Sequence, residues 1–346
     1  MELTERQKQI LSATVRTYIM TGEPVGSKML CEVMPIKVSS ATIRSVLSDL
    51  CEMGFLTQPH TSAGRVPTAM GYRFYVEELM QENSLSADQK NNIDRLLQPL
   101  YGSTESVLEE ACESLAALTG CAAMVTTPGE RTATLRSVQL ILIGKRTVMT
   151  VIVTSNGIIK NRVARCDMNV SPSQLENAQN AIDSTMVGKN LDDISAATSQ
   201  DVICKLGADM LLLAPIVTAV VDAVISAVES ELKLKGESNL LINNSFSGAK
   251  AARLLSFLQN RSSILGMLKA PKSNITVMLG DETGEDALMS SGMIITNYNL
   301  PGRTSGTIGI LGPERMDYER IIPGMLYFRD SLQRLLNNTF SDDGDL

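Results

Sequence analysis

Histidine is almost absent from this sequence: its 346 residues include one, His60. A Ser/His/Asp or Cys/His catalytic set would have to use this residue, which lies in a turn-rich segment. The six cysteines are scattered and none forms a C-x-x-C pair, so their spacing fits neither a zinc cluster nor a disulfide framework. The sequence therefore offers no reactive constellation, and we expect no enzymatic activity, no metal and no other cofactor.

Two further stretches lack the pattern of known binding loops. Residues 281–286 (DETGED) do not have EF-hand spacing, which favours a solvated turn over a cation site. Residues 309–318 (GILGPERMDY) lack the Lys-Ser/Thr pair of a P-loop and do not open a dinucleotide-binding unit. Neither stretch predicts a ligand.

The N-terminus and one apolar run bear on cellular location. The start, MELTERQKQIL, is charged and lacks the apolar core of a signal peptide, so we expect a cytoplasmic protein. Residues 210–228 are nearly long enough to span a membrane, but Pro215 interrupts them. Asp222 would also cost about 2.5–3.5 kcal/mol at a bilayer centre. A helix buried in a core or between subunits is favoured over a membrane span.

Charge is distributed unevenly along the chain. Residues 1–80 contain eight basic and eight acidic residues, so the net charge of −7 belongs entirely to the remainder. A neutral N-terminal segment is thus joined to an acidic body. A nucleic-acid coat over the whole protein is disfavoured, and the local placement of Arg and Lys decides where an anionic partner can bind.

Three helices are predicted near the N-terminus. Residues 5–20 carry a one-sided apolar pattern that breaks at Gly22, and a second helix is expected from Ser27. Ser39 is suited to cap a third helix, because its hydroxyl can accept a hydrogen bond from a free backbone N–H. Apolar residues repeat at helical spacing in this third helix: Ile43, Val46, Leu47 and Leu50.

The opposite side of the third helix is small, polar and free of acid until Asp49. Solvated helix faces usually carry Glu and Lys, so this composition favours a helix that enters the major groove of DNA. Hydroxyl groups can contact phosphates or base edges, and the Arg44 guanidinium can form paired hydrogen bonds with guanine or phosphate.

Residues 55–68 (FLTQPHTSAGRVPT) predict a two-stranded wing beside that helix. One strand is expected at 55–57 and the return strand at 65–66. Backbone N–H groups at the tip can meet phosphates, and His60 fits either a DNA-backbone contact or a brace of the turn. Thr68 is expected to cap a fourth helix, on which Arg73 lies off the apolar stripe and faces phosphate or solvent.

Several runs carry a resemblance to a known family. They are ERQKQIL, GEPVGSKML, VSSATIRSVLSDL, GFLTQPHTSAGRVPTAMGYRFYV and, near the C-terminus, GTIGILGPERMDYERII. In this order, over the whole length, the sequence resembles the heat-inducible transcription repressors of the HrcA family. The resemblance implies a homodimer that binds an inverted-repeat element called CIRCE in chaperone operons. It also implies that the GroE chaperonin helps the repressor to reach its active form.

The sequence pattern of the acidic body predicts both helices and strands. Helices are expected at 84–100, 104–119 and 318–337. Strands are expected at 134–143, 146–154 and 158–166, and again at 239–246, 275–282, 292–300 and 304–313. Strands on both sides of a helical block suggest one antiparallel sheet with an inserted subdomain, and the resemblance implies a GAF-like α/β domain interrupted by a dimerisation insert.

The fold class expected is therefore α+β, with a winged helix-turn-helix ahead of the GAF-like domain. The expected domains are 1–83 (winged helix-turn-helix), 84–120 (helical linker and start of the GAF-like domain), 121–189 with 250–346 (GAF-like domain) and 190–249 (dimerisation subdomain).

A dimer interface is expected on the apolar helix within residues 210–228. A helix that is apolar over so much of its circumference must be buried from several sides. Inverted-repeat operators require a two-fold dimer, so we expect a partner subunit to bury part of this helix. The residues expected there are Val217, Val220, Val221, Val224 and Val228.

The leading hypothesis is a homodimeric repressor of chaperone operons with operator DNA and the GroE chaperonin as partners. Two alternatives remain open: a regulator whose GAF-like domain binds a metabolite, and an enzyme fused to a DNA-binding module. The residues expected to contact DNA are Ser39, Ser40, Thr42, Arg44, Ser45, Ser48, His60, Thr61, Ser62, Arg65 and Arg73.

Overall fold

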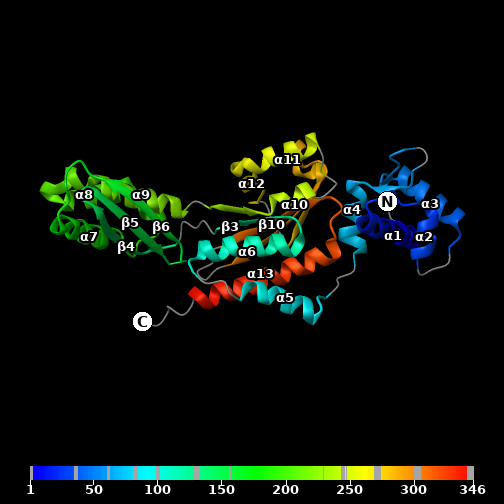
Figure 1. Cartoon of the computed structure of the whole chain (residues 1–346), viewed down its shortest axis with the longest axis horizontal. Coiled ribbons are helices and arrows are strands. Elements are labelled where there is room, and N and C mark those ends of the chain that lie inside the picture. The colour runs from blue at the N-terminus through cyan, green and yellow to red at the C-terminus, as the bar shows by residue number, and fades with distance from the viewer. Residues whose placement is uncertain are drawn as a thin grey trace.

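Three units follow one another along the longest axis of the molecule in the computed structural model (Figure 1). An N-terminal module stands at one end, a central domain lies in the middle, and an insert stands at the other end. The fold class predicted from the sequence, α+β, is confirmed. The structure describes residues 3–34, 38–60, 63–80, 84–98, 102–127, 133–155, 157–228, 230–242, 246, 248–268, 274–299 and 305–340.

The N-terminal module is a helix-turn-helix with a short wing. Thr4 begins the first helix through a capping box with Gln7, and Gly22 ends it with a φ of 70°. Tyr72 of α4 and Tyr75 of the following turn η1 pack into the same core as the first three helices. The elements are α1 (Glu5–Thr21), α2 (Ser27–Val33), α3 (Ser40–Glu52), β1 (Leu56–Thr57), β2 (Val66–Pro67), α4 (Ala69–Phe74) and the π-helical turn η1 (Tyr75–Leu79).

The central domain is built on a five-stranded antiparallel sheet in the order β7-β3-β10-β9-β8. Helices α5, α6 and α13 lie on one face, and α10, α11 and α12 on the other (Figure 1). Its elements are α5 (Ala87–Leu97), α6 (Thr104–Thr119), β3 (Ala122–Thr126), β7 (Leu232–Lys235), α10 (Glu237–Ile242), α11 (Ala249–Gln259), α12 (Arg261–Leu268), β8 (Thr276–Leu279), β9 (Ser291–Asn299), β10 (Ser305–Pro313) and α13 (Tyr318–Phe340).

Strand β3 shows how one sheet is covered on both faces. Ala123 and Val125 join the apolar cluster of α6 and α13, whereas Ala122 and Met124 join that of α10, α11 and α12. Successive side chains of a strand point to opposite faces, so a strand buried on both faces is apolar throughout. The first of these clusters continues into the N-terminal module, which therefore packs against the central domain.

The insert contains a three-stranded antiparallel sheet of its own, in the order β4-β5-β6. Helices α7 and α9 pack on one face of this sheet, and the described residues of its apolar core lie between 133 and 227. Its elements are β4 (Leu135–Gly144), β5 (Thr147–Thr154), β6 (Ile159–Arg165), α7 (Pro172–Met186), η2 (Leu191–Asp193), α8 (Ala196–Lys205), η3 (Gly207–Asp209) and α9 (Met210–Val228).

The insert therefore corrects the boundaries expected from the sequence. Residues 133–189 were assigned to the GAF-like domain, but they pack with 190–227 in one core separate from the central sheet. The strand expected at 239–246 was also wrong: α10 covers Glu237–Ile242, and the neighbouring strand is β7. A short apolar run does not distinguish a strand from a buried helical turn.

Helix α9 is the apolar run that raised the question of a membrane. The stretch Gly207–Val228 is long and apolar enough to cross one by length and composition alone. It packs on β5 and β6, and Ile216, Val220 and Ala223 have no exposed surface. Burial in the core of the insert explains the apolar residues on that side of α9, whereas Leu211 and Ile225 are 82% and 52% exposed.

Candidate nucleic-acid interface

Helix α3 presents one apolar and one polar side. The Ser39 hydroxyl caps it by accepting a hydrogen bond from the Thr42 backbone N–H at 3.1 Å, as the sequence predicted. Its apolar residues Ile43, Val46, Leu47 and Leu50 are buried against the other helices of the module. Three polar side chains on the opposite side are exposed to solvent: Arg44, Ser45 and Ser48.

The hydroxyl residues at the start of α3 also serve the fold of the module. The Ser39 and Thr42 hydroxyls lie 2.8 Å apart, and the Ser40 hydroxyl lies 2.9 Å from that of Ser27 at the start of α2. The Ser27–Ser40 contact fixes α3 relative to α2. The α3 residues that were expected to contact DNA thus fall into two groups. One group shapes the start of the helix, and the other consists of the three exposed residues farther along it.

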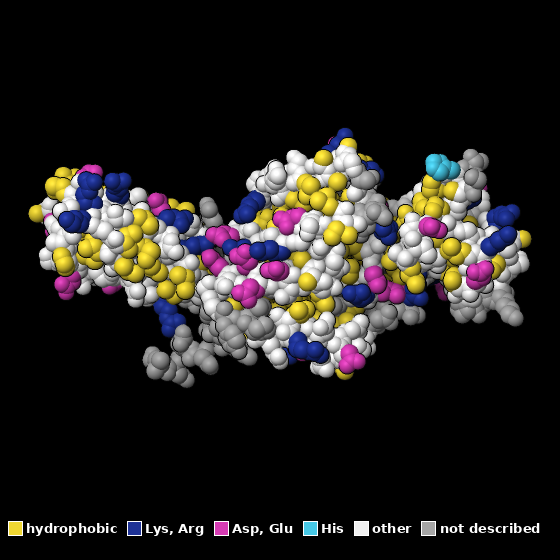
Figure 2. Space-filling model, in the orientation of Figure 1, with side chains coloured by type: hydrophobic (Ala, Val, Ile, Leu, Met, Phe, Trp, Pro, Cys, Tyr) yellow, Lys and Arg dark blue, Asp and Glu magenta, His cyan; other side chains and the backbone are white. Residues whose placement is uncertain are grey.

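The wing lies beside α3, attached to the segment between α1 and α2. Leu56 and Thr57 pair with Pro67 and Val66, and Gln58 braces the loop by donating a hydrogen bond to the Ala63 carbonyl at 3.0 Å. His60 is exposed, and Figure 2 shows it in cyan at the surface of the module. Thr61 and Ser62, two of the predicted contacts, lie outside the described residues.

Arg65 has an unusual environment at the base of the wing. Its backbone forms two hydrogen bonds of 2.8 Å with Val25, which adds a third extended segment to the wing. One guanidinium nitrogen donates to the Ala63 carbonyl at 3.4 Å. Its Nε–H is buried and has no acceptor among the described residues.

Arg73 points away from this surface and toward the central domain. Its Nη2 donates to the Val277 carbonyl oxygen at 2.7 Å, and its Nε donates to the Glu282 carboxylate at 3.0 Å. The expectation that Arg73 faces phosphate is therefore corrected: its guanidinium is bound within the chain. The sequence showed only that Arg73 lies off the apolar stripe of its helix, which does not reveal a partner about two hundred residues away.

Comparison with known proteins identifies the family. The family model described as "HrcA protein C terminal domain" matches residues 105–322 of the chain. The chain belongs to the HrcA family. The resemblance that the sequence motifs suggested is thus confirmed.

Relatives of the HrcA family match almost the entire chain. A protein of Desulforudis audaxviator named "Heat-inducible transcription repressor HrcA" is 33% identical over 98% of this chain and 100% of its own length. One of the same name from Acetivibrio thermocellus is 30% identical over 99% of both chains. A crystal structure described only as a hypothetical protein has the same fold, with a TM-score of 0.66 and 24% identity over 97% of this chain and 98% of that chain.

The valines that the sequence placed in an HrcA dimer interface are mostly interior. Val217, Val220 and Val224 of α9 are at most 1% exposed, because they pack against the sheet of the insert within one subunit. Val221 and Val228 are partly buried against the same cluster. The expected placement is therefore corrected for the first three, which cannot reach a partner.

The opposite face of the insert sheet is rich in apolar side chains, and no helix of the described residues packs on it. Ile141, Met149 and Val163 lie side by side across the three strands, and Val153 and Ile159 form a second row. Val163 is 58% exposed, and Ile141 and Ile159 are about 40% exposed. Figure 2 shows hydrophobic side chains gathered on the visible face of the insert. We refer to the surface formed by these two rows of residues as the open sheet face.

Potential metal ligands and thiols can be placed within the described part of this HrcA-family chain. No group of three or more His, Cys, Asp or Glu side chains there is arranged to hold a metal ion. Burial raises the pKa of the Cys112 thiol to about 12 and that of Cys121 to about 11, so both are protonated at neutral pH. The relatives are named as repressors, in agreement with the expectation that the chain is not an enzyme.

Proposed function

We propose that this chain is a transcription repressor that binds an inverted-repeat operator as a homodimer. One observation carries the proposal: the exposed side of α3 combines Arg44, Ser45 and Ser48 next to a wing, and the first acidic residue follows only at Asp49. Such a side fits between phosphate-lined groove walls, where carboxylates would be repelled. The names of the relatives agree with this role.

Within the proposed complex, α3 lies in the major groove and the wing follows the adjacent backbone. Arg44 reads a base or binds a phosphate, and Ser45 and Ser48 donate to phosphates or base edges. A phosphate oxygen at the wing would also accept a hydrogen bond from the partly exposed Arg65 guanidinium. His60 and the tip residues Thr61 and Ser62 remain proposed backbone contacts, and Ser39, Ser40 and Thr42 contribute mainly by fixing the start of α3.

The proposed dimer forms through the open sheet face. An exposed apolar surface of this kind on a soluble protein usually marks an interface. A two-fold axis through it would bring two copies of the same face together, which is the arrangement that a palindromic site requires. Val221 and Val228 border the insert core and are kept only as peripheral contacts.

We further propose CIRCE as the operator and the GroE chaperonin as a modulator. A monomer with an uncovered open sheet face presents the apolar surface that a chaperonin binds. When unfolded clients occupy the chaperonin during heat stress, fewer subunits would reach the dimeric form and repression would fall. The naming of the relatives as heat-inducible supports this order of events.

Footprinting of the purified protein on its own chaperone promoters tests the proposal. We expect protection of both halves of an inverted repeat, and a lower protein concentration for half protection when GroE and ATP are added. Protection of a single half, or none on any palindromic promoter fragment, would contradict the homodimeric repressor. An unchanged footprint with GroE would remove only the chaperonin from the proposal.

One cavity favours a second function, a regulator that responds to a metabolite. It measures about 210 Å³ at the end of the central sheet and is lined by the polar side chains of Thr126, Asn297 and Thr307. This volume is below the range of about 300–1,000 Å³ that is usual for ligand pockets, so only a small molecule would fit. A metabolite screen by thermal shift distinguishes the two: a ligand that raises the melting temperature of the wild type but not of Asn297→Leu supports the alternative, and no such ligand favours the simple repressor.

A further inference from the structure

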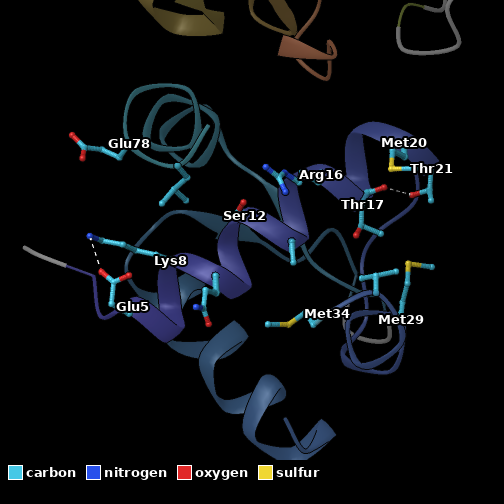
Figure 3. A pocket seen from close by; sticks show the side chains of 14 residues that line it. Glu5, Lys8, Ser12, Arg16, Thr17, Met20, Thr21, Met29, Met34 and Glu78 are labelled. Carbon is cyan, nitrogen blue, oxygen red and sulfur yellow. Dashed lines mark hydrogen bonds and ion pairs between the residues drawn. The ribbon is translucent and has the colours of Figure 1, made fainter. Parts of the chain in front are cut away.

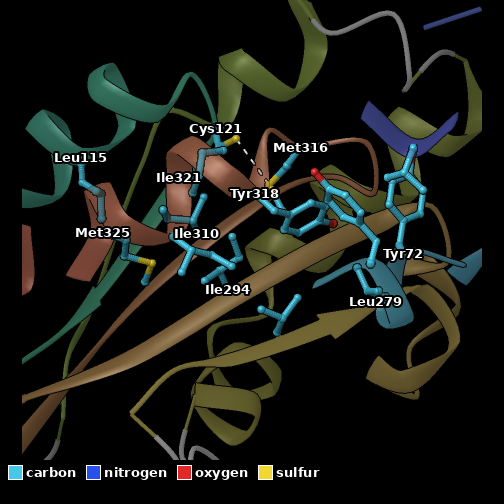
Figure 4. Close-up of a cluster of buried hydrophobic side chains, with 14 of the residues drawn as sticks. Tyr72, Leu115, Cys121, Leu279, Ile294, Ile310, Met316, Tyr318, Ile321 and Met325 are labelled. Carbon is cyan, nitrogen blue, oxygen red and sulfur yellow. Dashed lines mark hydrogen bonds between the residues drawn. The ribbon is translucent and has the colours of Figure 1, made fainter. Parts of the chain in front are cut away.

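The N-terminal module is joined to the central domain by a built interface. Tyr72 of α4 and Tyr318 of α13 are both buried, and their ring centroids lie 6.2 Å apart. Figure 4 shows the Tyr72 side chain directed toward Tyr318 and Leu279 of the central domain. Two ion pairs also connect the module to the central domain, Arg16–Glu319 and Arg73–Glu282, and we call the aromatic contact with these pairs the joint.

The first ion pair connects α1 to the start of α13. Nε and Nη2 of Arg16 lie 2.9 and 2.6 Å from the same carboxylate oxygen of Glu319. The Tyr75 hydroxyl donates to that oxygen at 2.7 Å. Three donors from two helices of the module thus converge on one carboxylate in the first turn of α13.

The second ion pair connects α4 to the end of β8. Arg73 binds the Glu282 carboxylate and the Val277 carbonyl, and Glu282 is itself held by the Leu279 backbone N–H at 2.9 Å. Arg73 also contacts Glu77 one helical turn away, at 3.3 Å. The guanidinium is therefore fixed from both sides of the joint.

Two separate ion pairs restrict more than the distance between the units. A single contact allows the module to rotate about it, whereas the pairs at Arg16 and Arg73, with the aromatic contact, also fix the angle. Helix α3 packs on α1 through the module core. Its direction relative to the central domain is therefore set by the joint.

The joint is partly open to water. Arg16 lies in the wall of a groove of about 810 Å³ that also contains Met20, Met29 and Met34 (Figure 3). Its side chain is 41% exposed, and that of Glu282 is 39% exposed. Their partners Glu319 and Arg73 are 21% and 26% exposed, so both pairs are partly exposed. Such pairs contribute modestly to global stability and are weakened by salt. Loss of one pair is thus expected to change the angle of the module while the module itself stays folded.

We propose that Arg16 and Arg73 are positioning residues for operator recognition. They do not touch DNA. They fix the angle at which each module leaves its central domain, and in a dimer these two angles set the separation of the two α3 helices. The joint thereby determines which spacing between operator half-sites is bound. This inference depends on the proposed dimer on an inverted repeat.

The test compares a duplex with one half-site against inverted repeats whose spacer is lengthened or shortened one base pair at a time. The sequence used is the repeat protected by the wild type in footprinting. We expect Arg16→Ala with Arg73→Ala to bind the half-site within about twofold of wild type, since α3 is unchanged. Affinity for the repeat should fall about tenfold, because simultaneous binding loses its preset geometry, and the preference for one spacer should broaden.

Charge-exchange and conservative variants distinguish a loss of module positioning from damage to the fold of the module. The pair Arg16→Glu with Glu319→Arg should restore much of the spacer preference that Arg16→Glu alone removes. Tyr75→Phe removes one donor and should give an intermediate profile. Arg95→Ala, an exposed arginine on α5, is the matched control and should leave every duplex unaffected.

The outcomes distinguish this inference from the proposed function. If wild type prefers no spacer and binds the repeat no better than the half-site, the dimeric repressor itself is wrong and the inference falls with it. If wild type is selective and the double variant keeps its spacer profile, the joint does not position α3. Equal loss on half-site and repeat would show damage to the module and would also overturn the inference.

Discussion

A Cβ atom on Gly64 would lie 2.5 Å from the carbonyl oxygen of Pro24. These two residues belong to the wing and to the segment between α1 and α2, where Val25 and Arg65 exchange two backbone hydrogen bonds. The base of the wing is thus held against the helix-turn-helix at a distance that only glycine permits. The wing is placed relative to α3 by this close approach of two backbones.

Gly64→Ala should therefore displace the wing. The added methyl group meets backbone atoms, which cannot give way as a flexible side chain would, so we expect a loss of about 1–3 kcal/mol in the free energy of unfolding. Operator affinity should fall as well. Urea denaturation and fluorescence anisotropy measure the two effects. Gly266→Ala in α12 is the control, because nothing lies within 4 Å of its added carbon; equal effects of both substitutions would contradict the explanation.

Arg44→Ala tests direct reading of DNA by α3. If Arg44 forms paired hydrogen bonds to a base, operator affinity should fall by about 1–3 kcal/mol and the preference at that base pair should relax. Its exposed position predicts an unchanged melting temperature. Titration against operators substituted one base pair at a time measures both quantities, with Arg95→Ala as a second exposed arginine. Unchanged operator affinity would remove Arg44 from the interface.

Two valines of the insert test which surface forms the proposed dimer. Val163→Asp places a charge on the open sheet face, so we expect a folded monomer with weak binding to an inverted repeat. Val224→Asp buries a charge in the insert core, where the penalty is several kcal/mol, and should unfold the insert. Sedimentation velocity and circular dichroism distinguish these results. A dimeric Val163→Asp protein would contradict the open sheet face as the interface, and a folded monomeric Val224→Asp protein would restore the original assignment to α9.

The joint is expected to weaken in acid. Burial acts to raise the pKa of Glu282, but the hydrogen bonds from Arg73 and from the Leu279 N–H outweigh it, so that the pKa lies below its usual value of 4.5. A carboxyl group with a lowered pKa in the folded state stabilises the fold above pH 4.5 and loses this contribution as the pH falls through the lowered pKa.

Glu282→Gln removes that dependence and gives the corresponding measurement. The difference in unfolding free energy between wild type and Glu282→Gln should be constant above about pH 5.5 and shrink as the pH falls below 4.5. Denaturant titrations across this range provide the values. A difference that stays constant down to pH 3 would show that Glu282 is not held ionised by the joint.

Much of the module was predictable from the sequence because its signals are local. Ser39 caps a helix whose apolar residues repeat every three to four positions. Both features involve residues that are close together in the sequence. The final helix and the strands β4, β5, β6 and β10 were predicted for the same reason. The strand expected at 239–246 failed because four apolar residues fit either structure equally well.

The insert shows what a local sequence pattern cannot predict, namely which surface covers an apolar helix. The valines of α9 are apolar whether a sheet of the same subunit or a second subunit covers them, so the sequence could not say which. Ile141, Met149 and Val163 form an apolar row on the uncovered face of the sheet, but this row is recognised only when the three strands are placed side by side.

The sequence by itself determined the helix-turn-helix, its wing, the polar side of α3 and the family, because caps, periodicity and motifs are properties of neighbouring residues. Tertiary structure alone decided that Arg73 binds Glu282, that Arg16 binds Glu319, and that the buried Lys160 of the insert pairs with Glu105 of the central domain at 2.6 Å. An ion pair between residues far apart in the chain leaves no pattern in either local sequence. Its partners become known only when folding brings the two charges together.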